Sequence, residues 1–151
     1  MYGEVFVYIN ASDPTGLQVL DTLGVLIAPV NDLPILSDLT FVIAEDSLLN
    51  MPDTIFSSSF NDVDNVEMSR IRITSLPVQG DIYLNGDLIE SSEEILFNQL
   101  ESITYQPDLN YFGEDGFTWN AYDGISYALD SATVSISVTP VNDAPDVQPI
   151  E

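Results

Sequence analysis

The chain has 151 residues, of which 45% are hydrophobic and 10% aromatic, a composition that allows a buried core and argues against disorder. It carries 25 acidic residues against two basic ones and no histidine, for a net charge of −23. This charge excludes nucleic acid and anionic membrane surfaces as partners, because both are bound through lysine and arginine. Cysteine is absent, which excludes disulfides and zinc–thiolate sites, and no apolar run is long enough for direct membrane insertion.

A repeat divides the chain. The sequence Pro-Val-Asn-Asp-Leu-Pro at 29–34 returns as Pro-Val-Asn-Asp-Ala-Pro at 140–145, a separation of 111 residues (141 − 30) that is typical of one immunoglobulin-like sandwich. The likeness extends backwards, since Leu23, Val25 and Ile27 stand where Val134, Ile136 and Val138 stand in the second copy. We therefore expect residues 1–32 to be the last two strands and the linker of a preceding, truncated repeat, 33–143 to be a complete repeat, and 144–151 to begin a following repeat or linker.

Within 33–143 the dominant pattern is alternation of apolar and polar residues, which predicts half-buried strands. The last strand shows it best, because Ala132, Val134, Ile136 and Val138 alternate with serine and threonine. Further strands are predicted near Leu39–Ala44, Thr54–Phe56, Arg70–Leu76, Asp81–Leu84, Ile103–Gln106 and Phe117–Tyr122. The predicted fold is all-β, an immunoglobulin- or cadherin-like Greek-key β-sandwich of about seven strands.

Turn residues separate these strands. Asn85-Gly86 predicts a tight hairpin, while Ser91-Ser92-Glu93-Glu94 before Ile95, Leu96 and Leu100 predicts a capped helical turn. The aromatic residues on or beside the strands are expected in the core rather than on a sugar-binding platform; they are Tyr105, Tyr111, Phe112, Phe117 and Trp119.

The motifs of the complete unit, in order, resemble those of the bacterial cadherin-like repeats found in tandem in very large surface proteins. They are Glu45-Asp46, Asp62-Val63-Asp64, Pro77-Val78-Gln79-Gly80, Tyr105-Gln106-Pro107 through Gly113-Glu114-Asp115, Phe117-Thr118-Trp119 to Asp123-Gly124, and Val141 to Pro145. The resemblance covers about residues 33–145. It implies Ca²⁺ bound between successive repeats by acidic residues from the ends of both sandwiches and from the linker.

Strand order places the Asp62 and Asp64 loop and the Asp123 loop at the same end as the incoming linker, Asn31-Asp32. With the resemblance, these five residues are predicted to form a first calcium site. At the opposite end Glu45 and Asp46 approach the outgoing linker, Asn142-Asp143, and form half of a second site, with Glu114 or Asp115 as further candidates. Alternatives stay open, because asparagine and aspartate also form ordinary turns and solvated loops. An EF-hand is excluded, since Glu67 and Ile73 stand where that loop needs glycine and glutamate.

Without histidine, cysteine or lysine the chain offers no ordinary nucleophile and base, so we expect it not to be an enzyme. The function that the resemblance implies is a calcium-binding structural or adhesive repeat, secreted or at the cell surface, whose partners are neighbouring repeats of the same chain. The alternative is a carbohydrate- or protein-binding module, with a homophilic, protein or carbohydrate partner.

Overall fold

A computed structural model describes residues 3–64 and 66–144 and divides the chain into two compact units, residues 1–31 and 32–151. None of its helices within those described ranges is long and apolar enough to cross a membrane. Each unit is described by itself.

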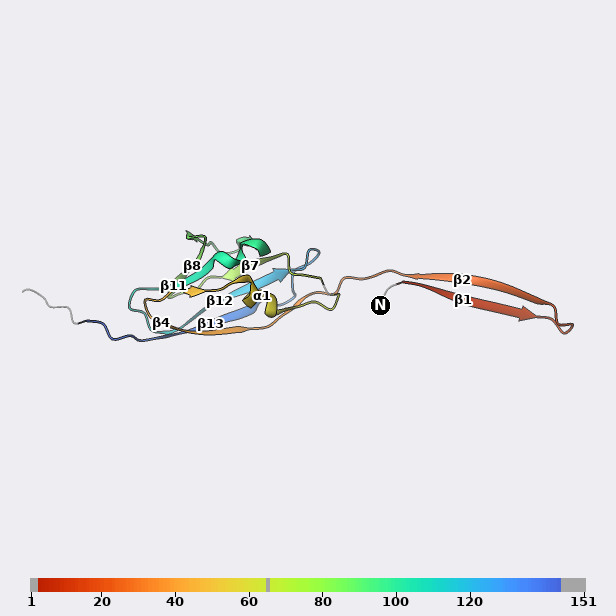
Figure 1. The fold of residues 1–151 in the computed structure, drawn as a ribbon, viewed down its shortest axis with the longest axis horizontal. Helices are drawn as coiled ribbons and strands as arrows, with labels where there is room; N and C mark the ends of the chain where they lie inside the picture. The colour runs from red at the N-terminus through yellow and green to blue at the C-terminus, as the bar shows by residue number, and fades with distance from the viewer. Residues whose placement is uncertain (1–2, 65, 145–151) are drawn as a thin grey trace, which may run out of the picture. The chain divides into compact units, whose positions relative to one another are not determined.

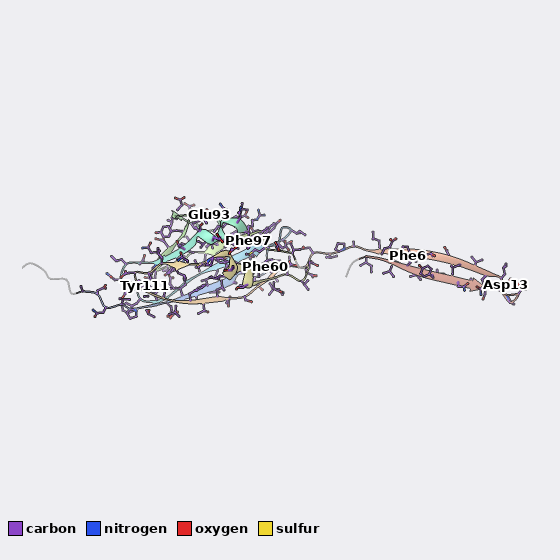
Figure 2. All side chains as sticks on the ribbon, viewed as in Figure 1. Phe6, Asp13, Phe60, Glu93, Phe97 and Tyr111 are labelled. Carbon is purple, nitrogen blue, oxygen red and sulfur yellow. The ribbon has the colours of Figure 1, made fainter. Side chains whose placement is uncertain are left out.

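The first unit is a β-hairpin in which β1 (Gly3–Ser12) pairs antiparallel with β2 (Gln18–Ile27) (Figure 1). Asp13 closes the turn at its tip, where Oδ1 accepts hydrogen bonds from the Thr15 amide at 2.9 Å, the Thr15 hydroxyl at 2.8 Å and the Leu17 amide at 2.9 Å (Figure 2). These bonds, the one from the Thr15 hydroxyl foremost, lower the pKa of the Asp13 carboxyl.

The pairing register of the hairpin matches that of two strands in the second unit, β12 (Gly113–Tyr122) and β13 (Ala132–Thr139). Val7 lies opposite Leu23 just as Phe117 lies opposite Val134. Val134 is buried and Phe117 nearly so, whereas Val7 and Leu23 keep 45% and 55% of their surface exposed. The apolar residues of the hairpin are therefore exposed at positions whose counterparts in the second unit are buried, and its assignment to a preceding repeat stays a prediction.

The second unit consists of two packed sheets. The larger has the order β10-β7-β12-β13-β4, with the bounds Glu94–Leu96, Arg70–Ser75, Gly113–Tyr122, Ala132–Thr139 and Leu39–Ala44. All of its pairs are antiparallel except that between β13 and β4, which is parallel. The smaller has the order β5-β11-β8-β9, with the bounds Leu49–Asn50, Ile103–Pro107, Gly80–Leu84 and Asp87–Leu88. A short pair joins β3 (Ile35–Leu36) to β6 (Phe60–Asn61). The all-β sandwich prediction is confirmed.

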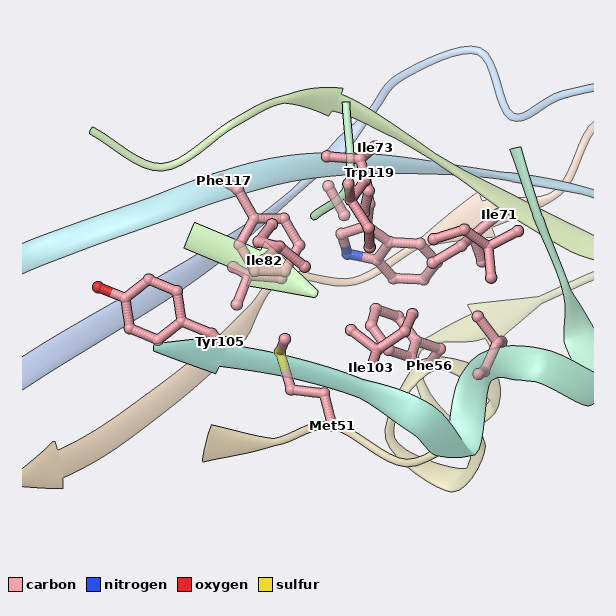
Figure 3. Close-up of a cluster of buried hydrophobic side chains, with 14 of the residues drawn as sticks. Met51, Phe56, Ile71, Ile73, Ile82, Ile103, Tyr105, Phe117 and Trp119 are labelled. Carbon is pink, nitrogen blue, oxygen red and sulfur yellow. The ribbon is translucent and has the colours of Figure 1, made fainter. Parts of the chain in front are cut away.

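The core lies between these sheets and centres on Trp119, which is fully buried and meets the ring of Phe56 edge-on, with ring centroids 5.1 Å apart (Figure 3). The alternation that predicts β13 is borne out, since its four apolar residues are all buried and its hydroxyl residues face outward. Of the aromatic residues expected in the core, Tyr105, Phe117 and Trp119 are buried and Tyr111 packs against it, but Phe112 is 60% exposed.

Two local predictions are wrong. The Thr54–Phe56 segment lies in a helix, α1 (Asp53–Ser58), rather than a strand. Pro52 fixes the backbone that leads into this helix, and Asp53 places an acidic side chain in its first turn, two features that outweigh the strand preference of threonine and isoleucine.

The predicted helical turn is displaced along the chain. Ser92 has a positive φ of 70° and donates its amide to the Ile73 carbonyl at 2.8 Å, so residues 91–93 form a turn at the edge of the sheet. The helical segment is instead a 3-10 helix, η1 (Phe97–Ser102), whose entrance is capped by Gln99 accepting from the Leu96 amide at 3.2 Å. The predicted following segment, 144–151, lies outside the described residues except for Ala144.

Candidate functional site

Three segments distant in sequence meet at one end of the sandwich. The Ser69 amide donates to the Tyr122 carbonyl at 2.9 Å, which aligns the loop before β7 with the loop after β12. The pairing of β3 with β6 brings the segment after Asp32 beside the start of the Asp62 loop. Strand order alone predicts this convergence. Successive antiparallel strands run in opposite directions, so every second loop lies at the same end of the sandwich.

Asp32, Asp62 and Asp64 are linked by two hydrogen bonds at this end. The Asp32 amide donates to Oδ2 of Asp64 at 2.8 Å, and the Asp64 amide donates to Oδ1 of Asp62 at 2.7 Å. Asp62 keeps only 9% of its surface exposed, and its Oδ2 is a buried atom for which the described part of the protein offers no hydrogen-bond donor. A buried carboxylate oxygen without a partner is costly, so Asp62 is suited to a cation.

The other two predicted ligands of this site differ from these three. Asp123 is 2% exposed, and its Oδ1 accepts from the amides of Ile125 and Ser126, each at 2.6 Å, so it shapes the loop after β12. Asn31 falls in the first unit, at the boundary with Asp32. A calcium role for all five residues stays a prediction.

A pocket of about 440 Å³ opens beside Asp62. Its wall combines acidic, amide and apolar side chains; the residues are Ser57, Phe60, Asn61, Asp62, Val66, Glu67, Met68 and Phe97. Asp62 therefore borders a space large enough for a hydrated ion.

At the opposite end, Glu45 is the buried acid. It is 5% exposed, and its Oε1 accepts from the Val141 amide at 2.5 Å, which ties it to the segment before Asn142-Asp143. Asp46 has a positive φ of 61° and accepts from the Asn110 amide at 3.4 Å, while the Asn142 side chain donates to the Asp143 carbonyl at 3.1 Å. Glu45 is thus fixed on the outgoing linker, and the remaining three residues lie at the same end.

The further candidate Asp115 has a structural role. Its carboxylate accepts from the amides of Val78 and Gln79 at 3.0 and 3.1 Å and from the hydroxyl of Tyr105 at 2.8 Å, so it joins the 77–80 turn to β11. Glu114, the other candidate, faces outward and accepts from the Ser137 hydroxyl at 2.8 Å.

Tyr105 makes stability sensitive to alkaline pH. Burial, and then the hydrogen bond to Asp115, raise the pKa of its hydroxyl above the usual 10. Because the folded state holds this proton more tightly than the unfolded state, the stabilisation is complete below pH 10 and is lost as the pH rises above it. We expect the melting temperature to fall above pH 10, and to fall less steeply in Tyr105→Phe, which cannot ionise there; equal slopes from pH 9 to 11.5 would contradict this origin.

The oxygen-rich ends suit a hard cation such as Ca²⁺, which takes about 6–8 oxygen ligands and needs neither histidine nor cysteine. Among residues 3–64 and 66–144, however, no three acidic side chains already form a cluster able to hold a metal ion. The fit therefore rests on the buried Oδ2 of Asp62, and amide, carbonyl or water oxygens must complete any coordination shell.

One conspicuous group was missed by sequence reasoning. Arg70 and Arg72, the only two basic residues, both lie against tyrosine rings, 4.2 Å from the centroid of Tyr122 and 4.4 Å from that of Tyr127, respectively. The available signal was their spacing of two on a predicted strand, which places both on one face. Tyr127 gave none, since it follows the predicted strand in a loop.

The chain was compared with known proteins, solved structures and protein families. No curated protein matches the chain. Among solved structures, an endo-fucoidan hydrolase from glycoside hydrolase family 107 matches 93% of this chain at 16% identity and a TM-score of 0.41, and this chain spans 19% of that protein. The fibronectin(III)-like modules of Clostridium thermocellum CbhA match 97% of this chain and 69% of theirs, at 14% identity and a TM-score of 0.37. Domains 4 and 5 of the S-layer protein SbsC match 89% of this chain and 70% of theirs, at 13% identity and a TM-score of 0.38.

The family comparison is more informative, because the model of the bacterial Ig domain matches residues 31–139, which is most of the chain. The match begins at the incoming linker and ends with β13, so it spans the whole sandwich. It confirms the resemblance to a bacterial immunoglobulin-like repeat, and the chain belongs to the bacterial Ig domain family.

Proposed function

We propose that this protein is a structural repeat of an extracellular surface protein, in which Ca²⁺ bound at the ends of the sandwich holds neighbouring repeats of the chain in line. Bacterial Ig domains are generally non-catalytic and often occur in extracellular or surface proteins. That setting supports a mechanical or adhesive role.

The observation that carries the proposal is the environment of Asp62. Its carboxylate is buried, one oxygen is used by the Asp64 amide, and the other meets no donor among the described residues. In a chain of net charge −23, the counter-charge for such a group has to come largely from outside. Asp32, tied to the same loop through Asp64, belongs to the linker, so a cation held here would join the linker to the sandwich.

Calcium is preferred over other cations for chemical reasons. Zinc and copper favour histidine imidazole and cysteine thiolate as ligands, and this chain has neither histidine nor cysteine. Magnesium demands a strict octahedral shell and gives up its water reluctantly, whereas Ca²⁺ accepts irregular sets of carboxylate, amide and carbonyl oxygens from separate loops.

The test is thermal unfolding with and without calcium. At about 10 mM free Ca²⁺ and a dissociation constant of about 0.1 mM, one site adds about 2.7 kcal/mol, which is roughly 8–10 °C in melting temperature for a domain of this size. Divalent ions also screen a chain of net charge −23, so sodium chloride at equal ionic strength serves as the reference.

A pair of matched variants separates binding from screening. Asp62→Asn removes the charge but keeps an oxygen for the Asp64 amide, so we expect most of the calcium-dependent shift to disappear while the calcium-free protein melts as before or slightly higher. Asp87→Asn removes one exposed charge from β9 and should leave the shift intact. Equal calcium shifts in both variants would overturn the proposal.

A further inference from the structure

The outer face of the larger sheet differs in composition from the rest of this acidic protein. The outward positions of its central strands carry arginine, tyrosine and hydroxyl side chains; they are Arg70, Arg72 and Thr74 on β7, Thr118 and Tyr122 on β12, and Thr133, Ser135, Ser137 and Thr139 on β13. On the five strands of this sheet, all of which the structure describes, Glu94 and Glu114 are the acidic residues that face outward. On the strands of this face, two positive charges therefore stand against two negative ones, in a chain of net charge −23.

Arg70, Arg72, Tyr122, Tyr127 and Glu94, here called the arginine–tyrosine cluster, lie at one end of this face. Tyr122 and Tyr127 contact each other with ring centroids 4.9 Å apart, and one arginine lies over each ring. Glu94 contacts Arg70 at 3.4 Å and accepts a hydrogen bond from the Tyr127 hydroxyl. The stacking holds both guanidinium groups in place before any ligand arrives.

Arg72 is the residue of this cluster whose guanidinium is available to bind a ligand. Glu94 lies directly opposite it across the β10–β7 pair, yet the Glu94 carboxylate goes to Arg70 and Tyr127 instead. Within residues 3–64 and 66–144, Arg72 makes no ion pair with any carboxylate, although the protein has many. Its donors are therefore available to an anion from outside, and a guanidinium presents them in the planar fork that matches an oxyanion.

Hydroxyl groups continue the surface from Arg72. Thr74, two residues along the same face of β7, forms a cluster with Thr118 at 2.7 Å and Ser131 at 3.3 Å, and Ser75 joins Thr118 at 2.7 Å. Each hydroxyl has one donor and two acceptor positions, so capacity for further hydrogen bonds remains. Beyond them lie the exposed hydroxyl residues of β13.

We propose that this face binds a saccharide chain carrying an oxyanion, with Arg72 holding the carboxylate or sulfate and the hydroxyl residues of β7, β12 and β13 contacting the sugar hydroxyls. The inference is independent of calcium binding at the ends of the sandwich. A saccharide fits better than an acidic protein, because a row of hydroxyl side chains without an apolar centre matches a hydroxylated ligand.

The experiment is calorimetric titration of the full chain with three oligosaccharides of equal length: a uronic-acid oligomer, a sulfated oligomer and a neutral oligomer. The buffer contains a chelator, so that calcium cannot bridge the ligand to the acidic loops. We expect the native protein to bind at least one of the two anionic oligomers at least tenfold more tightly than the neutral one; which of them binds identifies the oxyanion.

Two variants of Arg72 locate the contact. Arg72→Gln should weaken binding at least tenfold, and Arg72→Lys should also weaken it, because lysine keeps the charge but loses the fork. Val42→Gln places the same glutamine on the exposed edge strand β4 of the same face and should bind like the native protein. Melting temperatures within a few degrees of native show that the variants are folded.

Three outcomes would overturn the proposal. They are binding of neither anionic oligomer by the native chain, equal binding by Arg72→Gln, and binding that occurs only when calcium replaces the chelator. Sedimentation velocity supplies a further check, since a native dimer that Arg72→Gln converts to a monomer would assign the face to a second copy of the chain instead.

Discussion

Asp115→Ala is expected to destabilise the sandwich by about 3 kcal/mol, or roughly 10 °C in melting temperature. The substitution removes the acceptor of three hydrogen bonds, those from the amides of Val78 and Gln79 and from the Tyr105 hydroxyl. The two amides lie in a turn that water can reach, but Tyr105 is fully buried, so its hydroxyl would lose its partner without gaining another. An unsatisfied buried hydroxyl costs about 1–3 kcal/mol, and the released turn accounts for the rest.

The preceding residue supplies the control. Glu114→Ala removes the same kind of charge from the same strand, but Glu114 is exposed and contacts the Ser137 hydroxyl, so a change within about 0.5 kcal/mol is expected. Chemical denaturation followed by the fluorescence of Trp119 measures both. A loss from Asp115→Ala no larger than that from Glu114→Ala would show that the carboxylate does not organise the turn.

Asp115 also shows what sequence reasoning could and could not resolve. Glu114 and Asp115 both qualify as possible metal ligands from the sequence, because the sequence shows only that each is acidic and lies near the end of a predicted strand. The structural role of Asp115 follows from the face of the strand on which it lies. Asp115 is on the inner face of β12 with Phe117 and Trp119, whereas Glu114 points outward. The alternation of inward and outward residues along the predicted strand Phe117–Tyr122 contains this information. Extending that alternation back towards Gly113 places Asp115 on the inner face and Glu114 on the outer face.

The strands were predictable where burial imposes a strict period of two, as in β13 and β7, because one face must pack and the other must meet water. The helix at Asp53 and the turn at Ser92 were not, since short segments are decided by capping and by a single backbone conformation rather than by periodicity. Gly80 shows a further kind of constraint, because a Cβ there would lie 2.5 Å from the Gln106 carbonyl oxygen.

The candidate sites were predictable to the extent that topology fixes them. Strand order was sufficient to bring Asp32 and Asp62 to one end, whereas hydrogen bonding decides what each acid does there. Asp62 has one buried carboxylate oxygen that meets no hydrogen-bond donor among the described residues, while Asp123, also a buried aspartate, uses Oδ1 to close its own loop. The arginine–tyrosine cluster lay beyond prediction because Tyr127 joins it from a loop that folds back beside β12.

Trp119→Ala is expected to cost about 4 kcal/mol, because it opens a large cavity where the indole packs edge-on against Phe56 between the two sheets. Trp119→Phe should cost much less, about 1 kcal/mol, for two reasons. A phenyl ring can still pack against Phe56, and the substitution removes the indole Nε1, a buried donor for which no acceptor lies in hydrogen-bond range among the described residues. Removing an unpaired buried donor returns about 1–3 kcal/mol, which offsets most of the lost volume.

A second large aromatic residue of the same core provides the comparison. Phe117 is 2% exposed and has no polar atom in its side chain, so Phe117→Leu, another moderate reduction in volume, carries only the packing cost of about 1–2 kcal/mol. Since the Trp119 variants lack the only tryptophan, unfolding is followed by circular dichroism in all of them. Should Trp119→Phe prove as damaging as Trp119→Ala, the indole nitrogen must be hydrogen-bonded in solution, and the core at this point is polar rather than dry.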